Sequence, residues 1–259
     1  MYRAYNLQIA LGDWSDWQVN PLVVKRQEEV RGMLSNKLDH YVRPDSSLDG
    51  SAMQEDWFPQ LKPFHVFISH SHQDYDLALR LASKLWDTFQ LLAFIDSNVW
   101  GYSDDLLRYI DDRFCYNSER DTYSYSLRNK TTSHVHMMLM TAISQMMYNT
   151  ECLFFLNTPN SIDPARDIPS STFSPWIYSE LALARVMEKR SPATHRHSEI
   201  VKEAYAATDS QLKIKYKVSI QSLHDLRLSH MISWENRYLE NESQCSLDAL
   251  YSMSESCYE

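Results

Sequence analysis

Three short apolar runs in the middle of the chain predict buried strands. They are Phe64 to Ser69 (FHVFIS), Leu91 to Asp96 (LLAFID) and Glu151 to Asn157 (ECLFFLN). Apolar runs of this length that stop at polar residues are typical of strands covered on both faces.

Between and after these runs, apolar residues recur at helical spacing. Four helices are predicted, beginning near Leu77, at Ser103, at Ser133 and at Ser174, the last reaching about Lys189. Strands that alternate with helices predict an α/β fold, with an open, mainly parallel sheet flanked by helices.

The ends of the chain lack such alternation, so we divide it into three parts. Residues 1–61 are expected to form a helical extension and linker, because Pro21 follows Asn20 as in a capped helix start. Residues 62–222 are expected to form the main domain, and residues 223–259 a C-terminal helical tail. Within the main domain, Leu212 to Ile220 alternates like a half-exposed strand at a sheet edge.

Composition narrows the possible functions. Apolar residues make up 44% and charged residues 23%, which fits a globular protein, and the net charge of −9 argues against nucleic-acid or anionic-membrane partners. Only four glycines occur, and they form neither a GxGxxG motif nor a Walker-type loop. The absence of a secretory signal pattern and of CxxC spacing indicates a cytoplasmic protein.

Ligands of open parallel sheets bind outside the carboxyl ends of the strands. Here those ends are His70 to Asp74, Asp96 to Trp100, and the segment from Asn157 onward. The helix that carries Glu180 starts beyond the third end, so these segments are expected to converge.

The same segments carry a resemblance to a family. FISHSHQDYD (Phe67 to Asp76), FIDSNVW (Phe94 to Trp100) and SPWIYSEL (Ser174 to Leu181) resemble three boxes of Toll/interleukin-1 receptor (TIR) domains, in order and over roughly residues 62 to 220. The chain looks most similar to bacterial stand-alone TIR proteins, some of which serve anti-phage systems such as Thoeris. The resemblance implies a TIR/flavodoxin-like fold.

It also implies cleavage of NAD, as substrate rather than cofactor, between nicotinamide and ribose. Glu180 matches the catalytic glutamate of the third box, and a carboxylate there can stabilise an oxocarbenium-like ribosyl cation. Trp176 lies one helical turn before Glu180. With His70, Ser71, Asp96 and Trp100, it forms the expected substrate-binding set. Relatives carry basic residues after the first box, where this chain has Ser71 and His72.

Plainer interpretations exist for each residue. A glutamate in an amphipathic helix is usually solvated, a tryptophan is usually core, and a strand-terminal aspartate is often a turn-former. His134 and His136 lie two apart on a predicted helix and have no ligand partner at suitable spacing, so no metal site is expected.

Three functions therefore stand open. The first is an NAD-consuming TIR enzyme that self-associates through TIR surfaces and makes an ADP-ribose-derived signal for a separate effector in anti-phage defence. The second is a non-enzymatic TIR assembly module, in which Glu180 is structural and Trp100 anchors an interface. The third is another glycosyl-transfer enzyme on a similar sheet, such as a nucleoside deoxyribosyltransferase.

Overall fold

A computed structural model of the chain describes most of its 259 residues. The described ranges are 1–31, 38–44, 48–58, 64–163, 171–196, 216–217, 220–240 and 245–255. All statements about structure below refer to these ranges.

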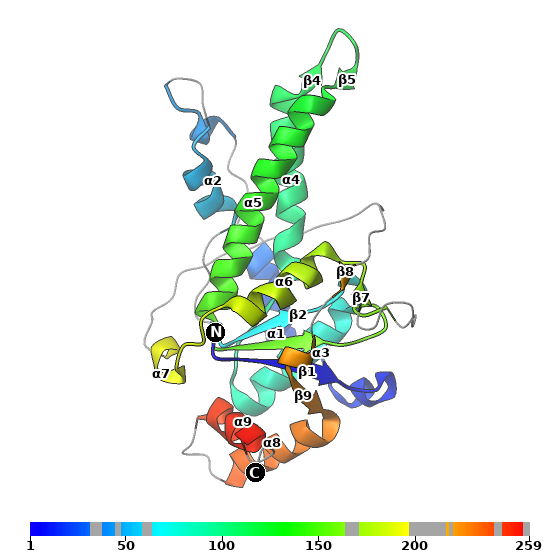
Figure 1. The fold of residues 1–259 in the computed structure, drawn as a ribbon, viewed down its shortest axis with the longest axis vertical. Coiled ribbons are helices and arrows are strands. Elements are labelled where there is room, and N and C mark those ends of the chain that lie inside the picture. Colours follow the sequence, from blue (N-terminus) through cyan, green and yellow to red (C-terminus); the bar gives the residue numbers. More distant parts are fainter. Residues whose placement is uncertain are drawn as a thin grey trace.

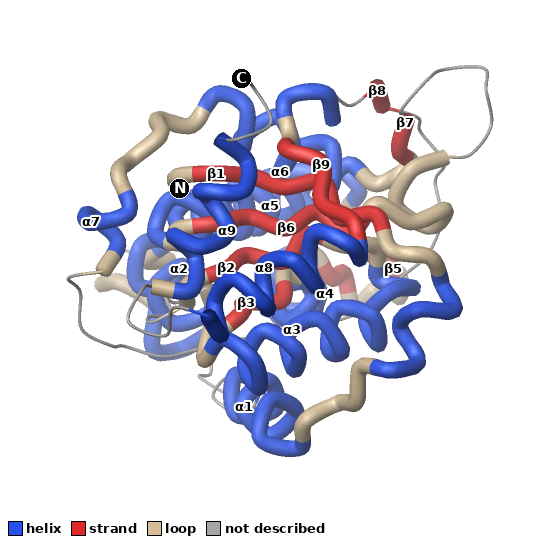
Figure 2. Tube along the Cα trace, turned by 90° about the horizontal axis from the view of Figure 1, so that it is seen from below, coloured by secondary structure: helices blue, strands red, loops and turns tan. Residues whose placement is uncertain are grey.

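The centre of the molecule is a five-stranded sheet whose neighbouring strands all pair in parallel (Figure 1). Its strands are β1 (Arg3–Gln8), β2 (Val66–Ser69), β3 (Ala93–Ile95), β6 (Cys152–Leu156) and β9 (His224–Arg227). Their order is β3-β2-β6-β1-β9, and Figure 2 shows β3, β2, β6 and β1 side by side. The predicted α/β fold with a parallel, flavodoxin-like sheet is thus confirmed, and so are the three predicted strands.

The two ends of the chain supply strands as well as helices, which corrects the expected division. Strand β1 lies between β6 and β9, inside the sheet, although it falls in the expected helical extension of residues 1–61. The run was hard to recognise because Asn6 interrupts it. Asn6 is 2% exposed, and its side chain is satisfied by hydrogen bonds with Asp225 of β9 and with Asn157, which directly follows β6. The predicted helix start is confirmed: α1 (Pro21–Arg31) follows Asn20, whose side chain accepts from the Leu22 amide.

The C-terminal end shows the same correction. Strand β9 forms one edge of the sheet, and α8 (Leu228–Glu240) and α9 (Ser246–Glu255) follow it. The expected edge strand at Leu212 to Ile220 lies largely outside the described residues. Its described part, β8 (Tyr216–Lys217), pairs antiparallel with β7 (Ser171–Thr172) in a separate two-stranded sheet.

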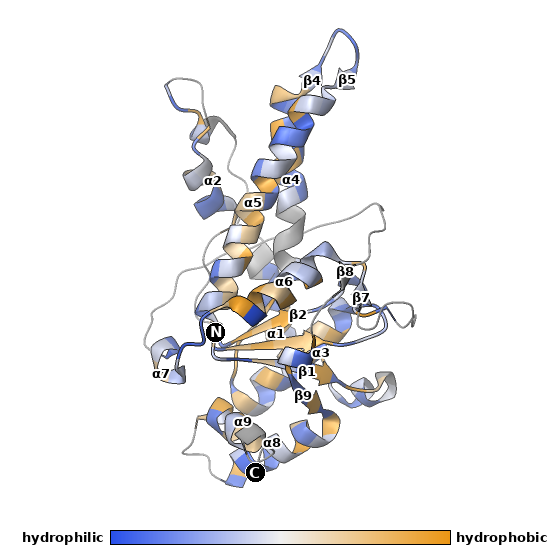
Figure 3. Cartoon of the chain, in the orientation of Figure 1, coloured by the Kyte–Doolittle hydropathy of each residue, from blue (hydrophilic) through white to orange (hydrophobic). Residues whose placement is uncertain are grey.

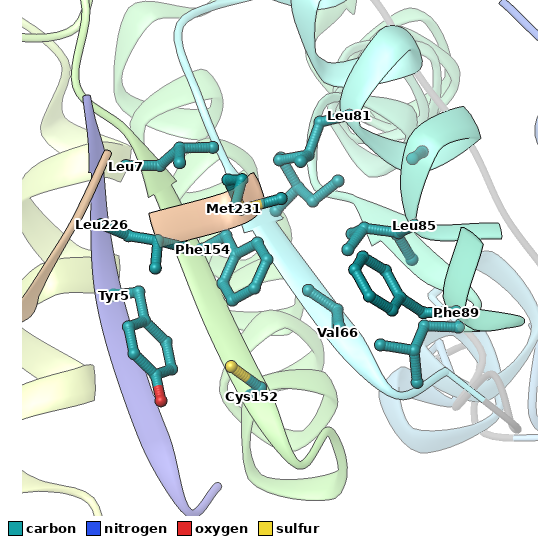
Figure 4. Packing of buried hydrophobic residues seen from close by; sticks show 14 of the residues in the cluster. Tyr5, Leu7, Val66, Leu81, Leu85, Phe89, Cys152, Phe154, Leu226 and Met231 are labelled. Carbon is teal, nitrogen blue, oxygen red and sulfur yellow. The ribbon is translucent and has the colours of Figure 1, made fainter. Parts of the chain in front are cut away.

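Side chains alternate along the strands and feed two hydrophobic cores, one on each face of the sheet. The α3-side core, part of which is shown in Figure 4, joins the sheet to α3 (Tyr75–Phe89), α8 and α9 and includes Tyr5, Leu7, Val66, Ile68, Phe89, Phe154 and Trp234. The α5-side core joins it to α4 (Ser97–Phe114), α5 (Tyr125–Asn149) and α6 (Pro175–Val186) and includes Ala4, Phe67, Phe94, Leu139, Phe155 and Leu181.

Helices α4 and α5 extend together beyond the sheet as an arm (Figure 1). Strands β4 (Tyr116–Asn117) and β5 (Thr122–Tyr123) form a small antiparallel ribbon at its tip. The helices begin earlier than Ser103 and Ser133, the predicted starts: α4 begins at Ser97, directly after β3, and α5 begins at Tyr125. Figure 3 shows that the central strands are mainly apolar, whereas polar and apolar residues alternate along the arm.

The two remaining α-helices of the described residues are α2 (Gly50–Trp57), which lies against α5, and α7 (Pro192–His195). Four short 3-10 helices also occur there: Leu11–Asp16, Leu38–Tyr41, His72–Asp74 and Ile220–Ser222. Helix α2 lies within residues 1–61, which were expected to form a helical extension and linker, and Asp49 caps it by accepting from the Ser51 and Ala52 amides. None of the described helices has the length and apolar character needed to cross a membrane.

Candidate functional site

Polar side chains gather at the carboxyl ends of β2 and β3, on the face covered by α6. Phe67 and Phe94 project into the α5-side core. Because side chains alternate along a strand, Ser69 and Asp96, two positions later, face the same side. Both are buried, at 0% and 1% exposure.

Helix α6 brings Glu180 to these two residues. The helix starts in a defined way, because the Ser174 hydroxyl accepts from the Ile177 amide and Pro175 takes the first helical position. Ile177, Leu181 and Ala184 then bury one face of the helix in the α5-side core. Glu180 lies on that buried face, and it is only 1% exposed.

The two carboxylate oxygens of Glu180 have different surroundings. The Ser69 hydroxyl donates to Oε2 over 2.6 Å, whereas Oε1 is buried and has no hydrogen-bond partner among the described residues. Burial first, and then the nearby Asp96 carboxylate, raise the pKa of Glu180 well above its ordinary value, while the bond from Ser69 works in the opposite direction. Glu180 can therefore hold a proton at pH values where an exposed glutamate is ionised.

Asp96 connects Glu180 to His70 and Ser97. The Asp96 Oδ1 atom lies 2.5 Å from His70 Nδ1 and also accepts from the Ser97 amide over 2.7 Å, which caps α4. On the other side of the imidazole ring, His70 Nε2 lies 3.0 Å from Ser97 Oγ. The exposed fractions of His70 and Ser97 are 4% and 6%.

A second polar group fixes the loops after β2 and β6. Asp74 is 3% exposed and accepts hydrogen bonds from Thr158 Oγ1, Asn160 Nδ2 and, at 3.5 Å, Ser161 Oγ. The Ser71 amide donates to the same Ser161 hydroxyl over 3.2 Å. These contacts hold the loop that carries His70 against the loop that follows β6.

The polar row continues across the other strands of the sheet. The Asn157 side chain donates to Asn6 Oδ1 over 2.9 Å, and Asn6 Nδ2 donates to Asp225 Oδ1 over 3.0 Å. Polar groups therefore occupy the carboxyl ends of β2, β3 and β6, where ligands of parallel sheets bind, and the row continues at Asn6 inside β1 and at Asp225 near the start of β9.

The six predicted site residues fall into separate groups. His70 and Asp96 lie with Glu180, and Ser71 belongs to the loop contacts of Ser161. The ring of Trp176 is partly buried against the α5-side core and meets His136 edge-on, at 5.6 Å between centroids.

The remaining predicted residue, Trp100, occupies the first turn of α4, and its side chain lies outside the described part of the structure. No group of three or more His, Cys, Asp or Glu side chains placed to hold a metal ion occurs among the described residues.

Comparison with known proteins gives no relative: no protein-family model matches the chain, and neither do curated proteins or solved structures.

Sequence reasoning missed Ser69 and Ser97, two serines that touch the predicted residues directly. One signal could have found Ser69: it lies two positions after Phe67 on the same strand, so its hydroxyl faces the same side of the sheet, the side covered by α6. Ser97 gave no such signal, because its position depends on α4 starting directly after Asp96.

Proposed function

We propose that this protein cleaves the bond between nicotinamide and ribose in NAD, and that Glu180 is the catalytic residue. The observation that carries the proposal is Glu180 itself, a fully buried acid at the carboxyl ends of the central strands with Oε1 unpaired in the described structure. Buried carboxyl groups with perturbed pKa values concentrate at functional sites. The three sequence boxes with TIR resemblance support the same residue.

In the proposed reaction, nicotinamide leaves C1 of the ribose with the bonding electron pair. Water then adds to the resulting oxocarbenium-like cation and loses a proton, which gives ADP-ribose. An ionised Glu180 stabilises that cation, while Ser69 holds Oε2 and leaves Oε1 for a ribose hydroxyl. The positive charge of the bound nicotinamide ring favours the ionised form, so substrate binding releases the proton that burial retains.

The other predicted residues take binding roles in this proposal. His70, Ser71 and Asp96 contact the ribose and phosphate side, and Trp100 and Trp176 form walls near the nicotinamide. Glu180 is 1% exposed in the ligand-free chain, so NAD reaches it only through a local opening. We further propose a cytoplasmic role in anti-phage defence, in which a separate effector senses an ADP-ribose-derived product.

The deciding experiment is incubation of concentrated protein with NAD, alone and in lysate from infected cells, with the products identified by mass spectrometry. Glu180→Gln should reduce nicotinamide release about a thousandfold, because the charge that stabilises the transition state is lost. Glu188→Gln is the matched control, since Glu188 follows the same helix and is exposed. The proposal would be contradicted if wild type and E180Q released nicotinamide equally. It would also be contradicted if the wild type released none, either alone or in the lysate. Nucleosides assayed in parallel would reveal a deoxyribosyltransferase instead.

A second candidate, assembly without catalysis, is favoured by the arm. Its surface displays several exposed apolar side chains: Tyr109, Phe114, Tyr116, Tyr123, Tyr125, Leu127 and Met137. Aromatic residues are enriched in protein interfaces. Under this proposal, a second copy of the chain covers the arm. Tyr125→Ser, at the most exposed of these residues, should weaken self-association in light scattering, whereas Leu22→Ser, at an apolar residue of α1 that is 67% exposed, should not.

A further inference from the structure

Ser97, His70 and Asp96 form a continuous line of side chains. Ser97 Oγ lies 3.0 Å from His70 Nε2, and His70 Nδ1 lies 2.5 Å from Asp96 Oδ1. The histidine comes from the end of β2, while the serine and the aspartate come from the junction of β3 and α4. The contact between Ser97 and His70 is a hydrogen bond, as expected between a nucleophile and its base. Asp96 lies close against Nδ1 without hydrogen-bond geometry, so its carboxylate acts on the imidazole ring through its charge.

The contacts of the imidazole assign its two nitrogens. A carboxylate next to Nδ1 favours the proton on that nitrogen, which leaves Nε2 as an acceptor. The hydrogen bond between Ser97 and Nε2 therefore runs from the serine hydroxyl to the histidine. This is the tautomer in which histidine can accept a proton from serine.

Ser97 is not explained by helix capping. The Asp96 side chain caps α4, and the Ser97 amide is the group that it satisfies. Within the described residues, His70 is the only hydrogen-bond partner of the Ser97 hydroxyl. A serine that only served the helix start would bond to a backbone amide, as Ser174 does in α6.

We propose that Ser97 is a nucleophile activated by His70 and Asp96, and that the protein transfers acyl groups from small neutral esters to water. Ser97 Oγ attacks the ester carbonyl carbon, and His70 Nε2 takes the serine proton. The ester C–O bond breaks with its electron pair on the alkoxide, which receives that proton and leaves as an alcohol. Water, deprotonated by His70, then displaces Ser97 and releases the acid, and the proton returns to the serine.

The start of α4 suits the charge that develops in this reaction. Ser97 is the first residue of an 18-residue helix, so the negative charge on the attacked carbonyl oxygen forms at the positive end of the helix dipole. First-turn amide groups beyond Ser97 have no acceptor within the helix and can donate to that oxygen. This activity is separate from NAD cleavage, because an ester C–O bond breaks instead of the nicotinamide–ribose bond, and because Ser97 rather than water makes the first attack.

The experiment is covalent labelling of the full-length protein with a fluorophosphonate probe, without NAD, followed by peptide mapping. We expect labelling at Ser97 together with hydrolysis of p-nitrophenyl acetate. Ser97→Ala should abolish the label. His70→Asn should slow labelling and hydrolysis about a thousandfold or more, and Asp96→Asn should have an effect of the same order. Ser83→Ala is the control, because Ser83 is a buried serine whose hydroxyl, among the described residues, bonds to the backbone of Asn20 and Leu79.

Thermal unfolding of each variant checks that the fold is retained, and H70N keeps the test valid if S97A does not fold. An unlabelled wild-type protein would overturn the inference, and so would labelling that persists in folded S97A or H70N. Nicotinamide release is measured in separate samples. A chain that cleaves NAD but takes no label therefore disproves this inference alone, and a labelled chain that leaves NAD intact disproves only the proposed function.

Discussion

The Ser69 hydroxyl donates a 2.6 Å hydrogen bond to Glu180 Oε2, although 111 residues separate the two in the chain. The bond joins the end of β2 to the buried face of α6. Among the influences on the Glu180 pKa, it is the one that lowers it, against the effects of burial and Asp96. Ser69 therefore sets how readily Glu180 ionises, which gives the proposed reaction a measurable pH signature.

Ser69→Ala should raise the pKa of Glu180 further, because the hydrogen bond that lowers this pKa is lost. The acid limb of the pH profile of NAD cleavage should then move to higher pH, with about a tenfold loss of rate near pH 7. Ser179→Ala serves as the control, since Ser179 lies next to Glu180 but bonds to the Pro175 carbonyl. A profile that does not move in S69A contradicts the assigned role.

Glu180→Gln should make the protein more stable at neutral and alkaline pH. The raised pKa means that the folded chain keeps a proton which the unfolded chain releases above about pH 4.3. Stability of the wild type is therefore lost as pH rises from that value toward the pKa of the folded state, and glutamine removes this loss. Urea unfolding at pH 5 and pH 8 measures the effect: E180Q should gain stability over wild type, and the gain should be larger at pH 8. An equal difference at both pH values would show that the carboxyl group is not perturbed.

Arg196→Gln should destabilise the fold by about 3 kcal/mol, because it leaves a buried carboxylate without its cation. Arg196 bonds to Glu151, whose side chain is 3% exposed, and to Asp248 on α9. Chemical denaturation gives the loss. The double variant R196Q/E151Q should recover part of it, since the unpaired charge is then removed. A loss of only a few tenths of a kcal/mol would mean that the pair behaves like a surface salt bridge.

His195 should make stability fall as the solution becomes acidic. Burial first, and then the positive N-terminal amine, lower the pKa of His195 from 6.5 to about 4. Between these values the unfolded chain takes up a proton that the folded chain refuses, so stability decreases as pH falls through this window. Because His195 is partly exposed, the resulting change in the free energy of unfolding should be about 1 kcal/mol.

His195→Gln removes the titration and should flatten the urea midpoint between pH 6.5 and pH 4. His134→Gln is the comparison, because His134 is exposed on α5. If H195Q and wild type lose stability in parallel over this range, another group is responsible.

The sequence predicted the parts of the fold in which local pattern and burial agree. Strands β2, β3 and β6 are apolar on both faces, so their runs are unmistakable. Strands β1 and β9 contain fewer apolar residues. Each carries a polar residue, Asn6 or Asp225, and the sheet tolerates both because they form a hydrogen bond with each other. The local sequence around Asn6 does not reveal that its hydrogen-bond partner lies 219 positions away.

The sequence likewise predicted part of the candidate site and missed the rest. His70, Asp96 and Glu180 lie at strand ends or in a recognisable box, and the structure places them in one cluster. Trp176 also meets His136 of α5 edge-on, a contact between two helices that the periodicity of either helix alone does not encode. The contacts of Ser69 and Ser97 depend on the angle at which α6 and α4 meet the sheet, which no local pattern encodes.

The position of β1 has a consequence for how the protein is made. During translation, Arg3–Gln8 is synthesised first, but its partner at the outer edge, β9, ends at Arg227. At about 5 to 20 residues per second, roughly 10 to 45 s pass between the two. Through that interval one edge of β1 has no strand to pair with, and free strand edges are templates for aggregation. Synthesis of this chain should therefore depend on chaperones, or on a delay in sheet formation, until its last strand leaves the ribosome.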